Sequence, residues 1–322
     1  MNRTYLRQLL LSTNKLFITA EGYTSAMMDC FPLIAQSTPV PSAFFINANP
    51  PTYKDIAGSA LKQLIQTIKP RSELKDITIT DDFSSQELAE NAIAYHRVFG
   101  FITSSSKWYF SSKQFEQDLL TAESNPAISC HFLHINSPGG EAWYLDRLSE
   151  TMQSLQKPVL VLLEKACASA GYYIACHSPH IYALTLNDQI GCIGTMLDYL
   201  DFESYYEKLG IKRVSVKSSY SDLKNKKYDD LRKGHPEQFI KEELDPLSEQ
   251  FLAAVKKCRP KLAALPEDDP VFRGETFNTQ NSISNGLIDG CFTFAQSVAE
   301  ANRLGQEYTS GIQLQKSALR YV

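Results

Sequence analysis

The feature that most constrains the fold of this chain is a strand, helix, strand pattern between residues 132 and 163. Phe132 to Ile135 is a short apolar segment, and Ala142 to Leu155 places its apolar residues at steps of three and four, which predicts an amphipathic helix. Lys157-Pro158 ends that helix, and Val159 to Leu163 follows as an unbroken apolar run of strand length. This order predicts a βαβ unit, whose parallel strands are buried on both faces.

The same alternation of strands and helices extends along most of the chain. From Asn91 onward we expect the following further elements: a strand at Ala92–Thr103, a helix at Ser112–Glu123, a glycine-punctuated apolar segment at Ile190–Met196, a strand at Lys212–Val216 and a long helix at Pro236–Arg259. The predicted fold class is therefore α/β, with a parallel sheet built from repeated βαβ units.

The two ends of the chain have a different character. Residues 1–88 mix short apolar patches with segments rich in proline, serine and threonine, and we expect a mixed N-terminal extension with a helix at Ile56–Thr67. The chain after Leu304 is polar and is expected to be frayed. The predicted organisation is an N-terminal extension (1–88), a main domain (89–305) and a polar C-terminal tail (306–322).

Composition excludes several classes of partner. Of the 322 residues 43% are hydrophobic, enough for a sizeable core, and the net charge of -4 provides no basic field for nucleic acid. Seven cysteines without a C-x-x-C pair indicate reduced thiols in a cytoplasm rather than a disulfide framework. No apolar stretch approaches the roughly 18 residues of a membrane-spanning helix, and none has the form of a signal peptide. We therefore expect a soluble, cytoplasmic protein without membrane anchor, metal or cofactor.

The first candidate for chemistry is Asn136-Ser-Pro-Gly-Gly140, which lies between the predicted strand and the predicted helix. Glycines at such a place let the backbone turn tightly and direct its N–H groups outward, beside the positive end of the following helix. These N–H groups could hold a developing oxyanion. An ordinary strand-to-helix turn is the alternative, because glycine turns of this kind are common.

The second candidate is Ser169, which follows the Val159 strand and is flanked by Ala168, Ala170 and Gly171. Small neighbours at a strand-to-helix turn keep a nucleophilic hydroxyl exposed and aim the N–H of Ala170 at the carbonyl under attack. Its place just after a strand puts it at the carboxyl edge of the sheet, where open α/β sheets bind ligands. The alternative is a helix N-cap, for which serine is a preferred residue.

A nucleophilic serine also needs a base. None of the six histidines falls between residues 181 and 234, where a downstream partner is expected. His177 and His180 follow Ser169 too closely to fold back easily, and their spacing is a weak metal signal without a third ligand. Lysines are dense in this region: Lys217, Lys224, Lys226 and Lys227. A lysine serves as a base only when burial lowers its pKa towards neutrality, and a solvated basic loop is the alternative.

Four motifs now stand in order along the chain: Asn136-Ser-Pro-Gly-Gly140, Ala168-Ser-Ala-Gly-Tyr-Tyr173, Ile190-Gly-Cys-Ile-Gly194 and Gly286-Leu-Ile-Asp289. Together they resemble the signal peptide peptidase A family of serine peptidases, which belongs to the Clp protease and crotonase superfamily and includes phage capsid (prohead) peptidases. The resemblance covers roughly residues 90 to 303. It implies a Clp protease/crotonase-like fold of repeated βαβ units.

The resemblance also implies roles for individual residues. Ser169 matches the family nucleophile, and the N–H groups of Gly140 and Ala170 match the oxyanion hole, with Gly139 as support. Cys192 stands where family members usually have a serine that orients the catalytic lysine. Because a thiol hydrogen-bonds more weakly than a hydroxyl, this is a departure from the family pattern.

The catalytic lysine itself also departs from the pattern. The family lysine usually lies in a segment such as S-G-x-x-K-D, and an alignment without gaps places Ser221 at that position. Three residues later, Ser221-Asp-Leu-Lys224-Asn225 resembles the S-x-x-K-N variant of the phage-type members. The resemblance therefore assigns the base to Lys224, with Lys217 as the alternative.

The function implied is a serine endopeptidase in which Ser169 and Lys224 hydrolyse a peptide or an unfolded protein. Family members form rings, so we expect a homo-oligomeric ring with its active site near subunit interfaces. The expected setting is phage or prophage capsid maturation, acting on a portal or scaffold protein, and a cytoplasmic peptidase for signal peptides or general peptides is the runner-up. Two other classes stay open: a crotonase-like acyl-CoA enzyme, which needs no serine nucleophile, and a weak or inactive ring-forming scaffold protein, which Ser221 and Cys192 would explain.

Overall fold

The computed structural model describes residues 16–18, 52–68, 70–71, 74–198, 201 and 203–319, and for residues 16–18 and 316–319 it describes the backbone alone. Its strands are β1 (Leu16–Ile18), β2 (Ile79–Thr80), β3 (Ala92–Phe99), β4 (Ile102–Thr103), β5 (Phe110–Ser111), β6 (Ile128–Ser137), β7 (Gly139–Glu141), β8 (Val159–Ala168), β9 (His180–Ala183), β10 (Gln189–Gly191), β11 (Thr276–Phe277) and β12 (Gly290–Cys291). Its helices are α3 (Tyr53–Ile68), α4 (Ser112–Ser124), α5 (Leu145–Ser154), α6 (Ala170–Ala175), α7 (Glu203–Lys208), α8 (Lys226–Arg232), α9 (Glu237–Phe239), α10 (Asp245–Cys258), α11 (Pro260–Ala263), α12 (Thr279–Asn285) and α13 (Phe294–Leu319). A π-helical turn (Ile240–Leu244) joins α9 to α10, and a 3-10 turn lies at Pro270–Phe272.

The main sheet has the strand order β11-β10-β8-β6-β3-β2, with β9 paired to the first half of β8 and β12 paired to β9. The strand pairs are parallel except for β10 with β11. A parallel sheet of this kind needs crossover connections, and helices supply most of them along this chain. The predicted α/β class with a parallel sheet of βαβ units is therefore confirmed.

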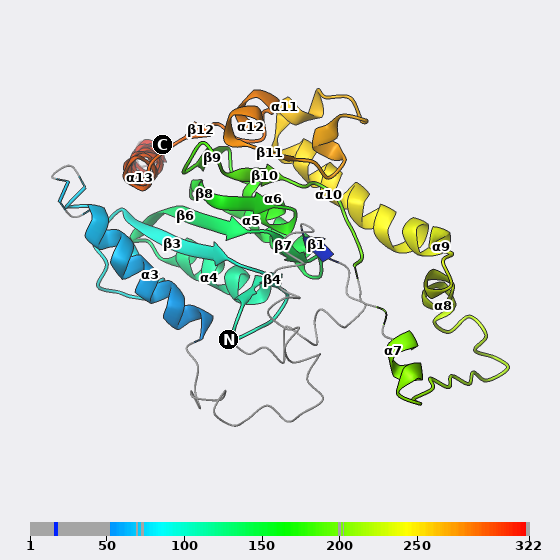
Figure 1. Ribbon diagram of the computed structural model, residues 1–322. Helices are drawn as coiled ribbons and strands as arrows, with labels where there is room; N and C mark the ends of the chain where they lie inside the picture. Colours follow the sequence, from blue (N-terminus) through cyan, green and yellow to red (C-terminus); the bar gives the residue numbers. More distant parts are fainter. Residues whose placement is uncertain are drawn as a thin grey trace.

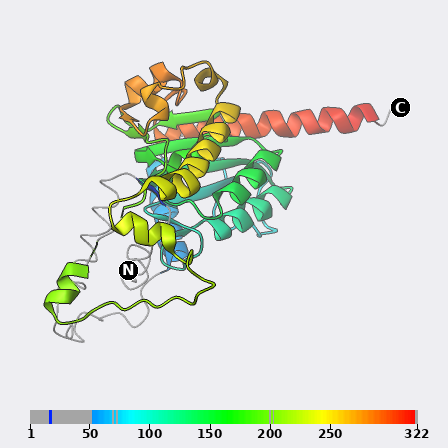
Figure 2. The same ribbon diagram turned by 90° about the vertical axis from the view of Figure 1, so that its right-hand side faces the viewer.

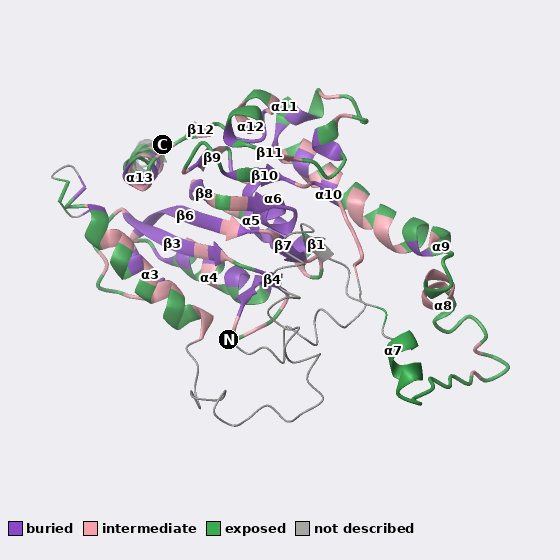
Figure 3. Cartoon of the chain, in the orientation of Figure 1, coloured by how far each residue is buried: buried purple, intermediate pink, exposed green. Residues whose placement is uncertain are grey.

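Helices cover both faces of this sheet (Figure 1). In β8 the odd-numbered residues Val159, Val161 and Leu163 belong to the core under α4, α5, α6 and α10, whereas Leu160 and Leu162 face α3 and α13. This alternation is the two-residue period of a strand, and both faces are apolar because both are covered. Figure 3 shows the central strands and α6 as mostly buried.

A second, four-stranded sheet has the order β1-β7-β4-β5. Its strand β7 contains both glycines of the Pro-Gly-Gly segment, and α5 begins only at Leu145, after the left-handed residue Tyr144 (φ 77°). The sequence pattern predicted these glycines beside the start of a helix at Ala142, and this prediction is wrong. The physical reason is that the glycine segment pairs with β4 instead of turning straight into a helix.

Two further expectations differ from the structure. The predicted strand at Lys212–Val216 is absent, because that segment is extended but pairs with no strand in the described part of the chain. The chain after Leu304 is helical rather than frayed, since α13 continues to Leu319. Ion pairs from Arg303 to Glu300 and Glu307 lie along this helix. The predicted helix at Pro236–Arg259 is present as α9, the π-helical turn and α10 in succession.

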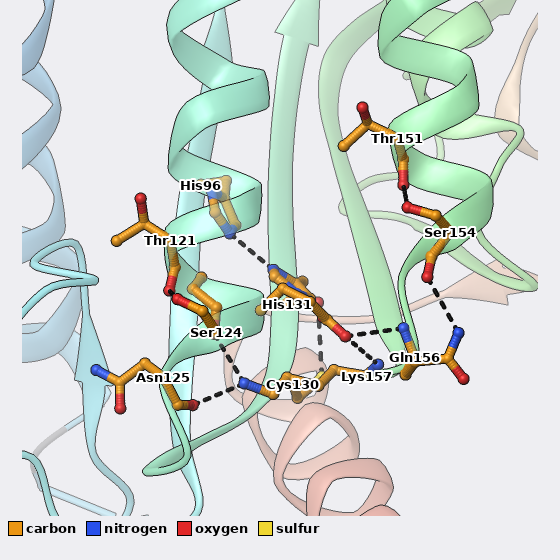
Figure 4. Close-up of polar contacts among 12 residues, drawn as sticks. His96, Thr121, Ser124, Asn125, Cys130, His131, Thr151, Ser154, Gln156 and Lys157 are labelled. Carbon is orange, nitrogen blue, oxygen red and sulfur yellow. Dashed lines mark hydrogen bonds and ion pairs between the residues drawn. The ribbon is translucent and has the colours of Figure 1, made fainter.

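Buried histidines form a polar network at the amino end of the central strands (Figure 4). His131 lies 3.0 Å from Glu123 Oε2 and 3.1 Å from His96 through its two ring nitrogens, and Lys157 Nζ donates to two backbone carbonyls at the end of α4. Burial lowers the pKa of both histidines. His131 pairs with the first residue of β8, so the network lies at the end of that strand opposite to Ser169. Its role is structural.

The fourth sequence motif, residues 286–289, ties three elements together. Arg259 Nη2 lies 2.8 Å from Asp289 Oδ1, and the other oxygen of Asp289 accepts a hydrogen bond from the N–H of Ile181 in β9 (2.9 Å). The hydroxyl of Tyr172 in α6 donates to a backbone carbonyl of the motif (2.8 Å). The motif therefore fixes the helix that follows Ser169 against the rest of the domain.

Replacing Asp289 by alanine is expected to lower the free energy of unfolding by about 2 kcal/mol, because it leaves the buried Arg259 guanidinium without its counter-charge. The cost is below that of a fully buried pair, since the Asp289 side chain is 25% exposed. Denaturant unfolding measures the effect, with the exposed Asp268→Ala as the matched control. Equal midpoints for the two variants would contradict this role.

Candidate active site

Three parallel strands end at one place in the main sheet. β6 ends at Ser137, β8 at Ala168 and β10 at Gly191, and the register aligns Ser137 with Cys167 and Ala168 with Gly191. Carboxyl ends of neighbouring parallel strands form the edge at which α/β proteins bind ligands. Ser169 follows β8 directly, so its predicted position at this edge is confirmed.

The backbone of Ser169 adopts a conformation that is rare for a residue with a side chain. Its φ is 54° and its ψ is -120°. Such backbone strain costs about 1–3 kcal/mol and persists only where the surroundings enforce it. Here the N–H of Ser169 donates to Gly191 O (2.8 Å), and its carbonyl accepts from the N–H of Tyr173 in α6 (2.8 Å). The strained turn is thus held from the neighbouring strand and from the helix.

Within the described residues, the side chain of Ser169 makes no hydrogen bond that would give this serine a structural role. Its hydroxyl does not cap α6, and its Oγ has no hydrogen-bond partner among the described residues. Ser169 thus occupies the N-cap position of α6, but its side chain does not act as a cap. The serine is fully buried, so the expectation of an exposed hydroxyl is wrong. A buried hydroxyl without a partner costs about 1–3 kcal/mol, which indicates a residue kept for a purpose other than stability.

Ala170 and Gly171 begin the helix that follows. The N–H groups of a first helical turn have no acceptor within the helix, so that of Ala170 is directed out of the start of α6. A Cβ on Gly171 would lie 3.2 Å from Ser137 Cβ, so glycine lets α6 pack tightly against the end of β6. The serine turn and the glycine motif are neighbours for this reason.

The two glycines of the first motif have different surroundings. Gly139 has a φ of 109°, and its N–H donates to Ser137 Oγ (3.1 Å), which stabilises the turn. Gly140 lies in β7 between β4 and β1, opposite Ile102 on one side and Phe17 on the other. A peptide that added to β7 on the β1 side would have to take the place of β1.

Gly140→Ala is expected to destabilise the protein by about 1–3 kcal/mol, because its Cβ would lie 2.1 Å from the carbonyl oxygen of Ile102. Thermal unfolding measures the loss. Gly311→Ala is the matched control, because a Cβ at that helical position meets nothing within 4 Å. A Gly140→Ala protein as stable as this control would show that β4 and β7 do not pack as closely as described.

Neither candidate lysine contacts Ser169 within one chain. Lys224 is exposed and lies just before α8, in a segment that both Figure 1 and Figure 2 show extending away from the sheet. Lys217 forms an ion pair with Asp229, its Nζ lying 2.8 Å from Oδ2. Because Ser169 Oγ has no hydrogen-bond partner there, the described part of a single chain contains no assembled serine–lysine pair.

Cys192 lies close to the serine along the backbone. The carbonyl of the preceding Gly191 holds the N–H of Ser169, and the N–H of Cys192 itself donates to Glu275 O (2.8 Å). Cys192 has a φ of 54°, so this turn is left-handed like that of Ser169. Burial, with a smaller effect of Glu275, raises the pKa of the Cys192 thiol to about 11. The thiol is protonated at neutral pH and can donate a hydrogen bond.

The sequence pattern did not indicate a group of residues that lies behind α6. It paired His177 with His180 as a weak metal signal, whereas the structure groups His177 with Cys176 and Cys258, whose potential ligand atoms all lie within 4.8 Å of one another. Cys258 ends a distant helix, so no local spacing in the sequence could have indicated this group. His177 is held by Ser149 and is not a partner of Ser169.

Among the described residues no helix has both the length and the apolar character needed to cross a membrane.

These observations define the class of protein. It is an α/β protein with a strained serine turn at the carboxyl edge of a parallel sheet, beside the strand β7 that contains the two glycines. Residues 151–307 match the model of peptidase family S49, and this match supports the family resemblance carried by the sequence motifs.

Several named proteases are similar to part of this chain. The chain is 29% identical over 191 residues to Protease 4 of Haemophilus influenzae, covering 58% of this chain and 30% of that protein. It is 24% identical to a putative signal peptide peptidase SppA of Enterococcus faecium, and the match covers 57% of this chain and 53% of that protein. It is 25% identical to a chloroplastic serine protease SPPA of Arabidopsis thaliana, and that match covers 60% of this chain and 28% of the other protein. The chain thus spans between about a quarter and about half of these relatives.

A solved structure also resembles this chain. It is that of a mutant of the 1510-N membrane-bound stomatin-specific protease in complex with a substrate peptide. The TM-score is 0.43 at 17% identity, covering 66% of this chain and 81% of the other.

Proposed function

We propose that this protein is a serine peptidase whose nucleophile is Ser169. The observation that carries the proposal is the strained backbone of Ser169 together with its buried, unpartnered hydroxyl at the carboxyl edge of the sheet. Neither feature contributes to stability, and both fit a hydroxyl positioned for attack on a substrate. The match of residues 151–307 to peptidase family S49 and the protease names of the relatives support the same reaction.

In the proposed reaction, Ser169 Oγ attacks a peptide carbonyl while Lys224 takes its proton. The N–H groups of Gly140 and Ala170 stabilise the tetrahedral oxyanion, and Lys224 then protonates the leaving amine. Water hydrolyses the resulting acyl-enzyme and regenerates the serine. Cys192 supports this site by hydrogen bonding near the lysine, with Lys217 as the alternative base.

The base is proposed to come from a second copy of the chain. Lys224 belongs to an arm formed by residues 203–234, and a series of exposed apolar side chains lies along it: Tyr205, Leu209, Ile211, Val214, Val216, Tyr220 and Leu223. Val216 is 90% exposed and Tyr220 is 99% exposed. Apolar surface this extensive is typical of a protein interface. Burying the arm against a neighbouring subunit would also remove Lys224 from water, the condition under which a lysine becomes a base.

The proposed substrate is an extended peptide segment of an unfolded protein, because β7 offers an antiparallel partner position beside Gly140 once β1 is displaced. The S-x-x-K-N form of the lysine segment supports a capsid-maturation role in a phage or prophage, with a portal or scaffold protein as substrate in the cytoplasm. A general cytoplasmic peptidase is the second candidate.

A fluorophosphonate probe and an unfolded protein substrate together test the proposed function. Concentrated wild-type protein is expected to cleave the substrate and to carry one phosphonate adduct on Ser169, located by peptide mass spectrometry. Ser284→Ala, an exposed serine of α12, should be labelled like wild type. A protein that turns over acyl-CoA thioesters and neither cleaves peptides nor reacts with the probe is a crotonase-like enzyme instead.

A further inference from the structure

Behind the serine helix, two cysteines from different helices face each other. Cys176 is the C-cap residue of α6, and Cys258 is the last residue of α10. Their sulfur atoms lie within 4.8 Å of each other. Only a modest approach of the two sulfurs separates this arrangement from a disulfide, whose S–S distance is about 2.05 Å.

The two thiols have different surroundings. Cys176 is fully buried, and its Sγ also lies 3.2 Å from Tyr173 O. Cys258 is partly exposed and has the cationic Lys257 beside it in the chain. A hydrogen bond from Cys176, with a smaller contribution from Lys257, lowers the pKa of the Cys258 thiol to about 7, whereas burial raises the pKa of Cys176 well above its usual value. The pair therefore combines a reactive, accessible thiolate with a buried thiol able to resolve it.

The nearby histidine makes a metal centre a poor fit to this group. His177 Nδ1 lies 2.8 Å from the carbonyl oxygen of Tyr173, and since a carbonyl only accepts, Nδ1 carries the proton. The other nitrogen, Nε2, then accepts from Ser149 Oγ (2.7 Å). Both ring nitrogens are thus committed, and a metal ion would have to break one of these bonds to gain a third ligand.

We propose that Cys176 and Cys258 form a reversible disulfide, made by peroxide oxidation, that ties the helix following Ser169 to the end of α10. Within the described residues the other cysteines differ from this pair: Cys130 and Cys167 are buried, Cys192 belongs to the site described above, and Cys291 is exposed. The thiol pair is a modification site separate from the peptidase chemistry and does not depend on it.

The oxidation proceeds in two steps. The Cys258 thiolate attacks one oxygen of hydrogen peroxide, the O–O bond breaks, and hydroxide leaves, so that Cys258 becomes a sulfenic acid. Cys176 sulfur then attacks the sulfenic sulfur, the S–O bond breaks, and the departing hydroxide takes the Cys176 proton to form water. In total two thiols lose two electrons, and one peroxide is reduced to two water molecules.

The movement needed falls on α10 rather than on α6. All six residues of α6 are buried, and Tyr172 anchors the helix through its hydroxyl. Cys258 has more freedom, because it is partly exposed and ends its helix. The bond would close a long loop of the chain, so the oxidised protein is expected to unfold at a temperature higher by several degrees.

The test uses the full chain in a Cys30→Ser background, because Cys30 lies outside the described residues. Protein purified under reductant is treated with a small excess of hydrogen peroxide, remaining thiols are alkylated, and peptides are mapped by mass spectrometry. We expect a disulfide between the peptides of Cys176 and Cys258, a loss of two thiols per chain, and full reversal by dithiothreitol. Cys291→Ser should behave like the parent protein. In Cys258→Ser, peroxide should form no disulfide, so this variant should not lose two thiols.

Two results would overturn the proposal. One is oxidation of Cys258 to sulfinic or sulfonic acid with Cys176 still alkylatable, which would mean that the thiols do not approach each other. The other is one equivalent of Zn²⁺ retained after dialysis, absent in Cys258→Ser and protecting both thiols from peroxide, which would make this group a metal centre. Cys258→Ser lies at a partly exposed helix end and is expected to fold, so the test does not depend on a variant of the buried Cys176.

Discussion

Ser169→Ala is expected to reduce peptide hydrolysis by roughly 10³-fold or more, because it removes the attacking oxygen and leaves only the contribution of substrate binding and the oxyanion donors. The same substitution should not destabilise the protein, since the Ser169 hydroxyl has no hydrogen-bond partner to lose in the part of the chain that the structure describes. Ser169→Gly should be equally inactive and more stable by about 1 kcal/mol, because glycine adopts the left-handed backbone without strain. Cleavage assays and denaturant unfolding measure the two effects separately.

The matched control for Ser169 is Ser178, a second buried serine near the end of the same helix. Its hydroxyl donates to Val159 O (2.6 Å), so Ser178→Ala is expected to lose about 1 kcal/mol of stability while retaining activity. A nucleophile and a structural serine thus give opposite patterns. If Ser169→Ala lost stability and kept its activity, the serine would be structural and the peptidase proposal would fail.

Lys224→Ala is expected to reduce cleavage by roughly 10²-fold or more, as expected for loss of a general base. Lys226→Ala is the control, because Lys226 lies on the same arm and pairs with Asp230 at the surface. Lys217→Ala tests the alternative base: a large loss in this variant with normal activity in Lys224→Ala would reverse the assignment. Circular dichroism of each variant checks that the substitution has not disturbed the fold.

A mixing experiment then distinguishes a dyad within one chain from a dyad between chains. Inactive Ser169→Ala and inactive Lys224→Ala are combined and allowed to exchange subunits. If the serine and the lysine come from neighbouring subunits, about a quarter of the sites regain both intact residues, and activity should return to that level. No recovery, with proven subunit exchange, would mean that the arm folds back onto its own chain.

The periodicity of the sequence was sufficient to predict the central part of the fold. The apolar runs at residues 132–135 and 159–163 and the amphipathic helix between them became β6, β8 and α5, because buried parallel strands and a half-buried helix require those patterns. The segment at Lys212–Val216 has the composition of a strand but no partner strand, so local preference did not decide its structure. The polar end of the chain forms the last turns of α13, whose first turns pack on the sheet through Ala295, Val298, Ala301 and Leu304.

The candidate site was predicted only in part. Composition and small neighbours located Ser169, but they could not separate a nucleophile from a helix cap, since both place a serine before a helix. The backbone angles of Ser169 and its unpartnered hydroxyl decided against the cap. The assignments of Lys224 and of the oxyanion glycine remain predictions.

What the sequence by itself determined is the order of strands and helices and the place of Ser169 at the end of a buried strand, because hydrophobic periods of two and three to four residues are local properties. Only the tertiary structure decided which groups meet. Within the described residues it brought no base to Ser169, placed Gly140 between two strands, and brought Cys176 to Cys258 from distant helices. Such contacts depend on how the helices pack over the sheet, which local patterns of residues do not specify.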